Sequence, residues 1–213
     1  MFLECNEVAP VFLEQDTWKD SEIWGKNITF HQSTHTQIVA PSGTGKTSFI
    51  HFLYGLRNDY SGTIKYNDTD LQSLSISNLS GFRQKNISIV FQDSKLFKDL
   101  TVFDNINVKR QLVIQYPEEK INEMSDQLGI FKKLKSKVST CSYGEQQRVA
   151  IIRSLMQPFD FLILDEPFSH LDEKNKEKAM ALIISECKKR NAGMILADLR
   201  THDFFSADQI CHL

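Results

Sequence analysis

Two short stretches of this 213-residue chain, residues 161–164 and 194–197, contain only apolar side chains. Uninterrupted runs of this length are typical of strands that are buried on both faces of a parallel sheet. Helical patterns lie between the strand signals, so we expect an α/β fold, in which ligands bind at the carboxyl ends of the strands. Further strand signals lie at residues 28–30, 37–40, 62–66 and 87–91.

The whole chain, residues 1–213, is interpreted as one domain, because no repeat or low-complexity linker divides it. From about residue 93 to residue 145 the pattern changes to helices with polar faces and few strand signals. We interpret this stretch as a helical subdomain that is inserted into the α/β core.

The balance of charge argues against a broad nucleic-acid-binding surface, since the net charge is −2 and the pI is near 6.3. We interpret the short basic run at residues 132–137 as a solvated face. The four cysteines are scattered without metal-ligand spacing, which indicates reduced thiols in a cytoplasmic protein. No stretch approaches the roughly 18 consecutive apolar residues of a membrane-spanning helix, so we expect any membrane role to need a partner.

A glycine-rich segment, APSGTGKTS at Ala40 to Ser48, follows one predicted strand and precedes a helical pattern. It matches the phosphate-loop motif GxxxxGK[ST], except that Ala40 replaces the first glycine. Its backbone N–H groups and the helix N-terminus would hold phosphate oxygens, Lys46 would bridge the β- and γ-phosphates, and Thr47 would ligate Mg²⁺. The alternative is a glycine-rich turn without a ligand. The predicted phosphate-binding residues are Ser42, Gly43, Thr44, Gly45, Lys46, Thr47 and Ser48.

Two carboxylates, Asp165 and Glu166, follow the apolar run at residues 161–164 directly. Beside a phosphate loop, Asp165 would hold Mg²⁺, and Glu166 would orient or deprotonate the attacking water. An acidic pair after a strand is also common in solvated loops. Together with the GTGKT segment, it favours ATP hydrolysis.

The segment CSYGEQQRVAI at residues 141–151 resembles the LSGGQ signature of ABC ATPases. Residues 89–92 resemble that family's Q-loop, residues 169–172 resemble its D-loop, and all the motifs stand in the family's order. The resemblance covers essentially the whole chain. It implies a P-loop NTPase core with a parallel sheet, N-terminal antiparallel β strands and an inserted helical subdomain.

The resemblance also implies a dimer, as a homodimer or an ABC heterodimer, with ATP at the interface. Each subunit would offer its signature to the nucleotide of the other subunit. Tyr143 and Cys141 depart from the family, which has Gly and Leu there, and the bulk of Tyr143 would hinder the approach of phosphate. The signature residues expected to act in trans are Ser142, Tyr143, Gly144 and Glu145.

Three further roles follow from the same resemblance. Gln92 would join Thr47 and Asp165 at the Mg²⁺ ion. Trp18 stands where the family has an aromatic residue that stacks on adenine. A place for Trp18 in the core is the alternative, and Trp24 is a weaker candidate for the stacking role.

The family's switch histidine, which contacts the γ-phosphate, has two competing positions here. The register of the run at residues 194–197 favours Asp198, whereas the tripeptide THD favours His202. We prefer Asp198, because His202 at the strand end would bury Asp198 and Arg200 and shorten the helix expected before the strand entry at residues 207–210. An ionised Asp198 would repel the γ-phosphate, so hydrolysis would be slow.

Residues 91–106 resemble ABC ATPases of the lipoprotein-releasing, macrolide-export and cell-division type. This implies an ATP-hydrolysing subunit that couples dimer closure to a separate transmembrane subunit, at the inner face of the cell membrane. Two alternatives stay open: a nucleotide-binding regulatory module with weak hydrolysis, and a soluble ABC ATPase that acts on the ribosome or DNA.

Overall fold

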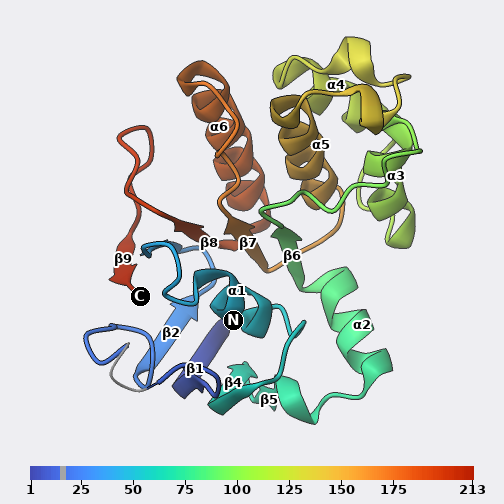
Figure 1. Cartoon of the computed structure of the whole chain (residues 1–213). Coiled ribbons are helices and arrows are strands. Elements are labelled where there is room, and N and C mark those ends of the chain that lie inside the picture. Colours follow the sequence, from blue (N-terminus) through green and yellow to red (C-terminus); the bar gives the residue numbers. More distant parts are fainter. Residues whose placement is uncertain (15–17) are drawn as a thin grey trace.

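Two β-sheets organise the chain in a computed structural model that describes residues 1–14 and 18–213 (Figure 1). An antiparallel sheet has the strand order β2-β1-β4-β5, and a parallel sheet has the order β6-β7-β8-β3-β9. This confirms the α/β fold with a parallel sheet and N-terminal antiparallel strands. The strands are β1 (Phe2–Pro10), β2 (Asn27–His31), β3 (His35–Val39), β4 (Tyr60–Tyr66), β5 (Thr69–Asp70), β6 (Ile87–Val90), β7 (Phe161–Asp165), β8 (Gly193–Asp198) and β9 (Gln209–His212).

The parallel sheet is covered on both faces, which explains its apolar runs. Along β7, Phe161 and Ile163 pack into a core cluster with α1 and the antiparallel sheet. The alternate residues, Leu162 and Leu164, pack into a second cluster with α5 and α6. The α-helices are α1 (Lys46–Leu53), α2 (Ile76–Lys85), α3 (Val102–Leu112), α4 (Glu119–Gln127), α5 (Tyr143–Leu155) and α6 (Glu173–Arg190).

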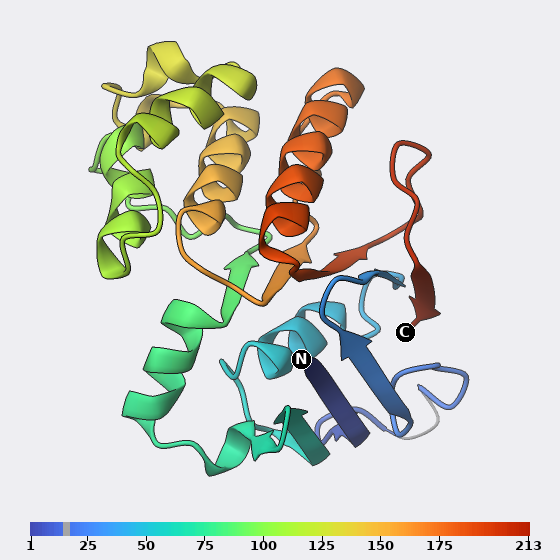
Figure 2. The ribbon, with the colours of Figure 1, turned by 180° about the vertical axis from the view of Figure 1, so that it is seen from behind.

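Helices α3 and α4 gather beside α5, on the side of the parallel sheet away from the antiparallel sheet (Figure 2). Thr101 caps α3, since its hydroxyl accepts a hydrogen bond from the N–H of Asp104 at 3.1 Å. Both helices lie within residues 93–145. That they form a separate subdomain stays a prediction.

One expected helix is absent. The sequence suggested a helix between Asp198 and the strand entry at Ala207, but residues 199–208 form a loop that leads into β9. The Asp198 carboxylate accepts a hydrogen bond from the N–H of Leu199 at 2.7 Å, an interaction that competes with helix formation. Phe205 is buried in the core cluster of α5 and α6 and so fixes the loop to the domain.

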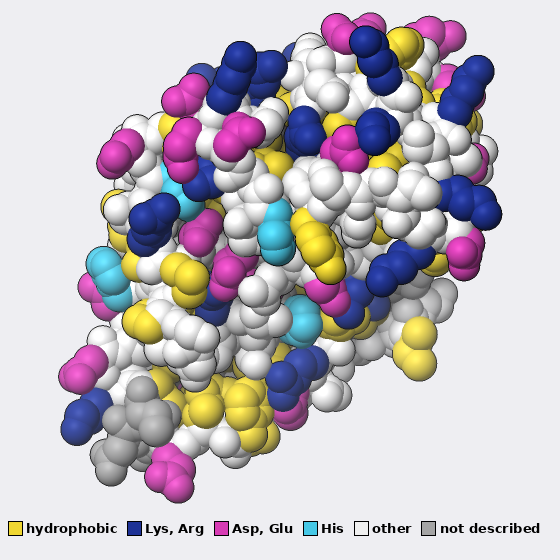
Figure 3. All heavy atoms as spheres, turned by 45° about the horizontal axis from the view of Figure 1, so that its top comes forward, with side chains coloured by type: hydrophobic (Ala, Val, Ile, Leu, Met, Phe, Trp, Pro, Cys, Tyr) yellow, Lys and Arg dark blue, Asp and Glu magenta, His cyan; other side chains and the backbone are white. Residues whose placement is uncertain are grey.

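Two elements carried no clear sequence signal. Helix α2 has no fully buried residue, although the partly buried Phe82 packs against the Tyr66 ring, and Ser75 starts the helix by accepting a hydrogen bond from the N–H of Asn78 at 3.2 Å. Strand β1 pairs with both β2 and β4, and its register is interrupted between Asn6 and Ala9. Among the described residues, no helix is both long and apolar enough to cross a bilayer. On the face in Figure 3, acidic and basic side chains are intermixed.

A buried ionic cluster ties the loop between α3 and α4 to α6. Glu186 accepts hydrogen bonds from the Tyr116 hydroxyl at 2.6 Å, from Lys189 at 2.7 Å and from Arg190 at 2.6 Å. Burial would raise the pKa of Glu186, but the bonds from Lys189, Tyr116 and Arg190 outweigh it and lower the pKa below its ordinary value. The ionised carboxylate is therefore the form that holds this junction.

Truncation of Glu186 should destabilise the fold. Glu186→Ala leaves the buried Arg190 guanidinium without its carboxylate, so we expect the free energy of unfolding to fall by about 3 kcal/mol. Because the folded-state pKa is lowered, the contribution of Glu186 is present above its unfolded pKa and is lost as the pH falls through the folded pKa. Urea unfolding at neutral pH measures the loss. Glu177→Ala, on the exposed side of α6, is the control, and equal stabilities of the two variants would contradict this account.

Candidate active site

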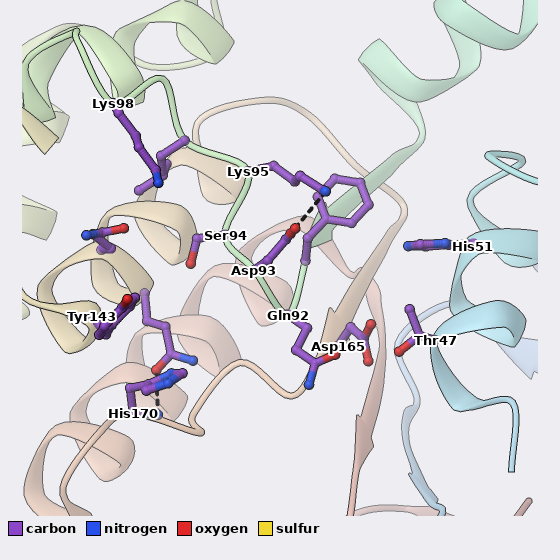
Figure 4. A pocket seen from close by; sticks show the side chains of 14 residues that line it. Thr47, His51, Gln92, Asp93, Ser94, Lys95, Lys98, Tyr143, Asp165 and His170 are labelled. Carbon is purple, nitrogen blue, oxygen red and sulfur yellow. Dashed lines mark hydrogen bonds and ion pairs between the residues drawn. The ribbon is translucent and has the colours of Figure 1, made fainter. Parts of the chain in front are cut away.

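Four neighbouring strands of the parallel sheet direct polar residues to one edge. Gln92 follows β6, Asp165 ends β7, Asp198 ends β8, and β3 leads into the glycine-rich loop. A cleft of about 710 Å³ opens beside this edge. Thr47 and Asp165 point toward one another on one side of the cleft, and Tyr143 and His170 lie on the other (Figure 4). Of the residues that the sequence singled out, the structure brings Thr47, Gln92, Tyr143 and Asp165 together in the lining of this cleft.

The glycine-rich loop needs its second glycine both for conformation and for space. Gly45 has a φ of 94°, in the left-handed region, and an added Cβ would lie 3.1 Å from the Trp24 ring. Ala40 is not among the described residues with positive φ, so its methyl group requires no strained backbone. Helix α1 begins at Lys46, immediately after the loop. This arrangement aims the first N–H groups of α1 at the space above the loop.

Trp24 supports the loop from below. Its side chain is only 1% exposed, and its indole N–H donates a hydrogen bond to the Thr44 carbonyl oxygen at 3.1 Å. Its ring meets Phe49 of α1 edge-on, with the ring centroids 5.2 Å apart. Burial excludes Trp24 from stacking on a ligand. No sequence pattern indicated this supporting role, which depends on tertiary packing.

Trp18 stands apart from the other predicted site residues. It is half-buried, does not line the cleft, and lies over Gly25, where an added Cβ would come within 2.9 Å of its ring. Its indole N–H is buried and has no hydrogen-bond partner among the described residues. Its role in adenine binding stays a prediction.

Lys46 is enclosed by acidic groups. The Lys46 side chain is 6% exposed, and its ammonium forms an ion pair with Glu166. Burial lowers the pKa of Lys46, and the negative charges of Asp165 and Asp198 oppose this effect. Lys46 therefore lies within electrostatic range of three carboxylates.

Asp165 is a buried carboxylate whose neighbour Thr47 does not reach it with full hydrogen-bond geometry. Neither of its oxygens has a partner within bonding geometry among the described residues. Burial raises the pKa of Asp165, and the charges of Asp198 and Asp93 add to this, against the opposing effects of Lys46 and Thr47. The nearby Lys46 ammonium is already paired with Glu166, so Asp165 has no counter-charge of its own. Its carboxylate faces the Thr47 hydroxyl (Figure 4). Oxygen donors of these two kinds suit a hard cation such as Mg²⁺.

Glu166 turns sharply out of β7. Its φ of 44° lies in the left-handed region, where a non-glycine residue is strained. Its backbone N–H donates to the Ala197 carbonyl oxygen at 2.9 Å, which ties the turn to β8. The turn directs the side chain toward Lys46 of α1.

The signature segment starts α5 at the far wall of the cleft. Ser142 and Glu145 form a capping box, in which each side chain accepts the other's backbone N–H, at 3.2 and 2.8 Å. Tyr143 is 71% exposed and stacks on His170, with the ring centroids 5.3 Å apart. A Cβ on Gly144 would lie 2.8 Å from the His170 carbonyl oxygen, so this close approach requires glycine. Within one chain, Tyr143 lies across the cleft from Thr47.

One side chain at the site, Gln147, had no assigned role from the sequence. Gln147 donates to the Ser169 hydroxyl at 2.7 Å and accepts the His170 N–H at 2.9 Å, which fixes residues 169–172 to α5. Its place in the signature segment was the available signal. The Ser48 hydroxyl accepts a hydrogen bond from Arg57 at 3.0 Å, and the role of Ser48 in phosphate binding stays a prediction.

The two competing switch residues contact each other. Strand β8 ends at Asp198, and Arg200 lies exposed in the following loop. The His202 Nε2 atom lies 2.8 Å from the Asp198 Oδ2 atom. The structure thus joins the two candidates as a pair, and the contact of either residue with phosphate stays a prediction.

Comparisons with known proteins give a family. A model of the ABC transporter family matches residues 25–169. The lipoprotein-releasing system ATP-binding protein LolD of Legionella pneumophila (strain Lens) is 30% identical over 182 residues, which cover 84% of this chain and 79% of LolD. The cell division ATP-binding protein FtsE of Bacillus subtilis (strain 168) is 32% identical over 176 residues, which cover 81% of this chain and 76% of FtsE.

A solved structure shares the fold. The dimeric post-hydrolysis state of the ATP-binding cassette MJ0796, bound to ADP and Pi, matches with a TM-score of 0.84 at 21% identity. The match covers 99% of this chain and 94% of that one. The fold thus agrees with the family that the sequence comparisons give: the chain belongs to the ABC transporter family of ATP-binding proteins.

Proposed function

We propose that this chain binds and hydrolyses ATP with Mg²⁺, as one half of a dimer, and drives a separate membrane subunit. The Asp165 carboxylate carries the proposal. It is buried, neither of its oxygens accepts a hydrogen bond of full geometry from the described residues, and it faces Thr47 beside the glycine-rich loop. A cation would compensate the negative charge of this buried carboxylate. The N–H groups of the neighbouring loop and helix N-terminus would bind the oxygens of a polyphosphate.

The loop residues from Ser42 to Ser48 would surround the phosphates with backbone N–H groups. Lys46 would exchange its ion pair with Glu166 for the β- and γ-phosphate oxygens. Trp24 keeps the loop in the receiving conformation before the nucleotide arrives, because it bonds to Thr44 and packs against Gly45. Trp18 is proposed to receive the adenine.

Thr47, Asp165 and Gln92 would hold the Mg²⁺ ion, since all three line the cleft beside the glycine-rich loop. When bound, the ion would neutralise negative charge on the phosphate oxygens. Glu166, released from Lys46, would then accept a proton from the attacking water or orient it. The strained turn at Glu166 keeps its carboxylate at the same edge of the sheet as Asp165.

The dimer would complete each site. Ser142, Tyr143, Gly144 and Glu145 would present the N-terminus of α5 to the nucleotide on the other subunit. The dimeric state of MJ0796 supports this arrangement. LolD is named as the ATP-binding protein of a lipoprotein-releasing system, and this supports a membrane partner and a peripheral position at the inner face of the membrane.

A nucleotide-binding module with weak hydrolysis is the second candidate. Two observations favour it: Tyr143 exposes a bulky ring where phosphate must approach, and the acidic Asp198 ends β8 beside the loop. Both features oppose a bound phosphate, the first by volume and the second by charge. Turnover measurements separate this candidate from the first.

Lys46→Ala should abolish ATP binding. The substitution removes the ammonium that neutralises the phosphates, so we expect affinity for Mg-ATP to fall at least about a hundredfold. Isothermal titration of the purified chain measures the change. Lys174→Ala, on the exposed side of α6, is the control and should bind as the unmodified chain does. Unchanged affinity in Lys46→Ala would mean that the nucleotide lies elsewhere.

Glu166→Gln should separate binding from hydrolysis. The amide cannot act as a base, so we expect turnover to fall by about 10² or more. ATP affinity should stay the same or rise, because Lys46 no longer leaves an ion pair and a negative charge near the phosphates is removed. Light scattering in saturating Mg-ATP should then show a dimer. A chain that binds ATP yet stays monomeric would count against the shared site, while unchanged turnover would exclude Glu166 as the base.

A further inference from the structure

Asp198 places a negative charge at the phosphate end of the sheet. It ends β8, between β7, which ends in Asp165, and β3, which leads into the glycine-rich loop. Its carbonyl oxygen accepts a hydrogen bond from the N–H of Ala40 at 3.0 Å, so its backbone borders the first residue of that loop. Asp198 acts electrostatically on both Lys46 and Asp165. A bare carboxylate here would repel a polyphosphate.

Each carboxylate oxygen of Asp198 has its own partner. The Oδ1 atom accepts the N–H of Leu199 at 2.7 Å, and the Oδ2 atom lies 2.8 Å from the Nε2 atom of His202. An ionised carboxylate can only accept hydrogen bonds, so the His202 Nε2 atom must carry the proton. The pair is largely shielded from solvent, with side-chain exposures of 13% and 8%.

Aromatic rings hold the His202 imidazole in this position. Phe204 stacks on it with centroids 4.8 Å apart, and Phe168 meets it edge-on at 6.1 Å. Phe168 belongs to the segment that follows Glu166, and it is buried in the core cluster of α5 and α6. The path of the loop at residues 199–208 therefore places His202 against the end of β8.

We infer that His202 is a positioning residue for the nucleotide site, which acts through Asp198. Its N–H fixes the Asp198 carboxylate and draws its negative charge away from the phosphates. This inference rests on the proposed function. It adds His202 as a residue that affects nucleotide binding through Asp198 and not by contact with the nucleotide. Because repulsion by Asp198 acts on bound ATP before any chemistry, loss of His202 should weaken ATP binding more than it slows the chemical step.

The test compares three substitutions of His202 in two backgrounds. His202→Phe keeps an aromatic ring between Phe168 and Phe204 but loses the N–H. His202→Gln loses the ring but can donate a hydrogen bond to Asp198, and His202→Ala loses both. Each is made in the unmodified chain and together with Asp198→Asn, which removes the charge. The ATP dissociation constant, KM and kcat are measured for all, and thermal unfolding checks that each variant folds.

We expect His202→Phe and His202→Ala to raise the dissociation constant and KM about tenfold or more, with kcat changed much less. His202→Gln should stay within about threefold of the unmodified chain. With Asp198→Asn present, all three substitutions should have little effect, because the charge that His202 controls is gone. His212→Ala is the matched control, since His212 pairs with the Glu22 carboxylate at 3.2 Å on the exposed edge strand β9.

Two results would overturn the inference alone. One is normal ATP binding by a folded His202→Phe variant, with the loss confined to His202→Gln and His202→Ala, which would make the role of His202 one of packing. The other is an equal loss with and without Asp198→Asn, which would mean that His202 does not act through Asp198. Failure of the unmodified chain to bind Mg-ATP would instead overturn the proposed function, and this inference with it.

Discussion

Strands β7 and β8 contact apolar side chains on both faces, from α1 and the antiparallel sheet on one side and from α5 and α6 on the other. Polar side chains in the middle of these strands would therefore be buried without water, at a cost of several kcal/mol for a charged group. Only the strand ends can carry charge, and the carboxyl ends do so with Asp165 and Asp198. The position of the candidate active site is thus a consequence of how the sheet is buried.

This constraint made much of the fold and the site predictable. Runs without polar residues at 161–164 and 194–197 indicated the buried strands, and the residues next to them indicated the site. The glycine-rich loop was equally clear, because the left-handed conformation of Gly43 and Gly45 restricts the residue type there. In each case a local physical requirement restricts which residue types can stand at neighbouring positions of the sequence.

Features that depend on distant contacts impose no such local restriction. The support of Thr44 by Trp24 and the clamp of Gln147 on Ser169 and His170 join segments far apart in sequence. Helix α2 has no fully buried residue, so burial restricts its sequence only weakly. The prediction of a helix after β8 was wrong for a similar reason. The hydrogen bonds of Asp198 and the burial of Phe205 hold this segment as a loop, and neither contact can be predicted from local helical propensity.

Three carboxylates lie near a single ammonium at the candidate site, and the groups around them explain how this excess of negative charge is tolerated. Lys46 pairs with Glu166 and feels Asp165 and Asp198, so three carboxylates share one ammonium. A polyphosphate would add negative charge to a group that is already short of positive charge. Each carboxylate has a different compensating group. Lys46 pairs with Glu166, the His202 imidazole contacts Asp198, and the proposed Mg²⁺ would compensate Asp165. In the proposed reaction Lys46 would turn to the phosphates, and Glu166 alone would lose its partner. Glu166 is also the carboxylate from which that reaction requires a free lone pair.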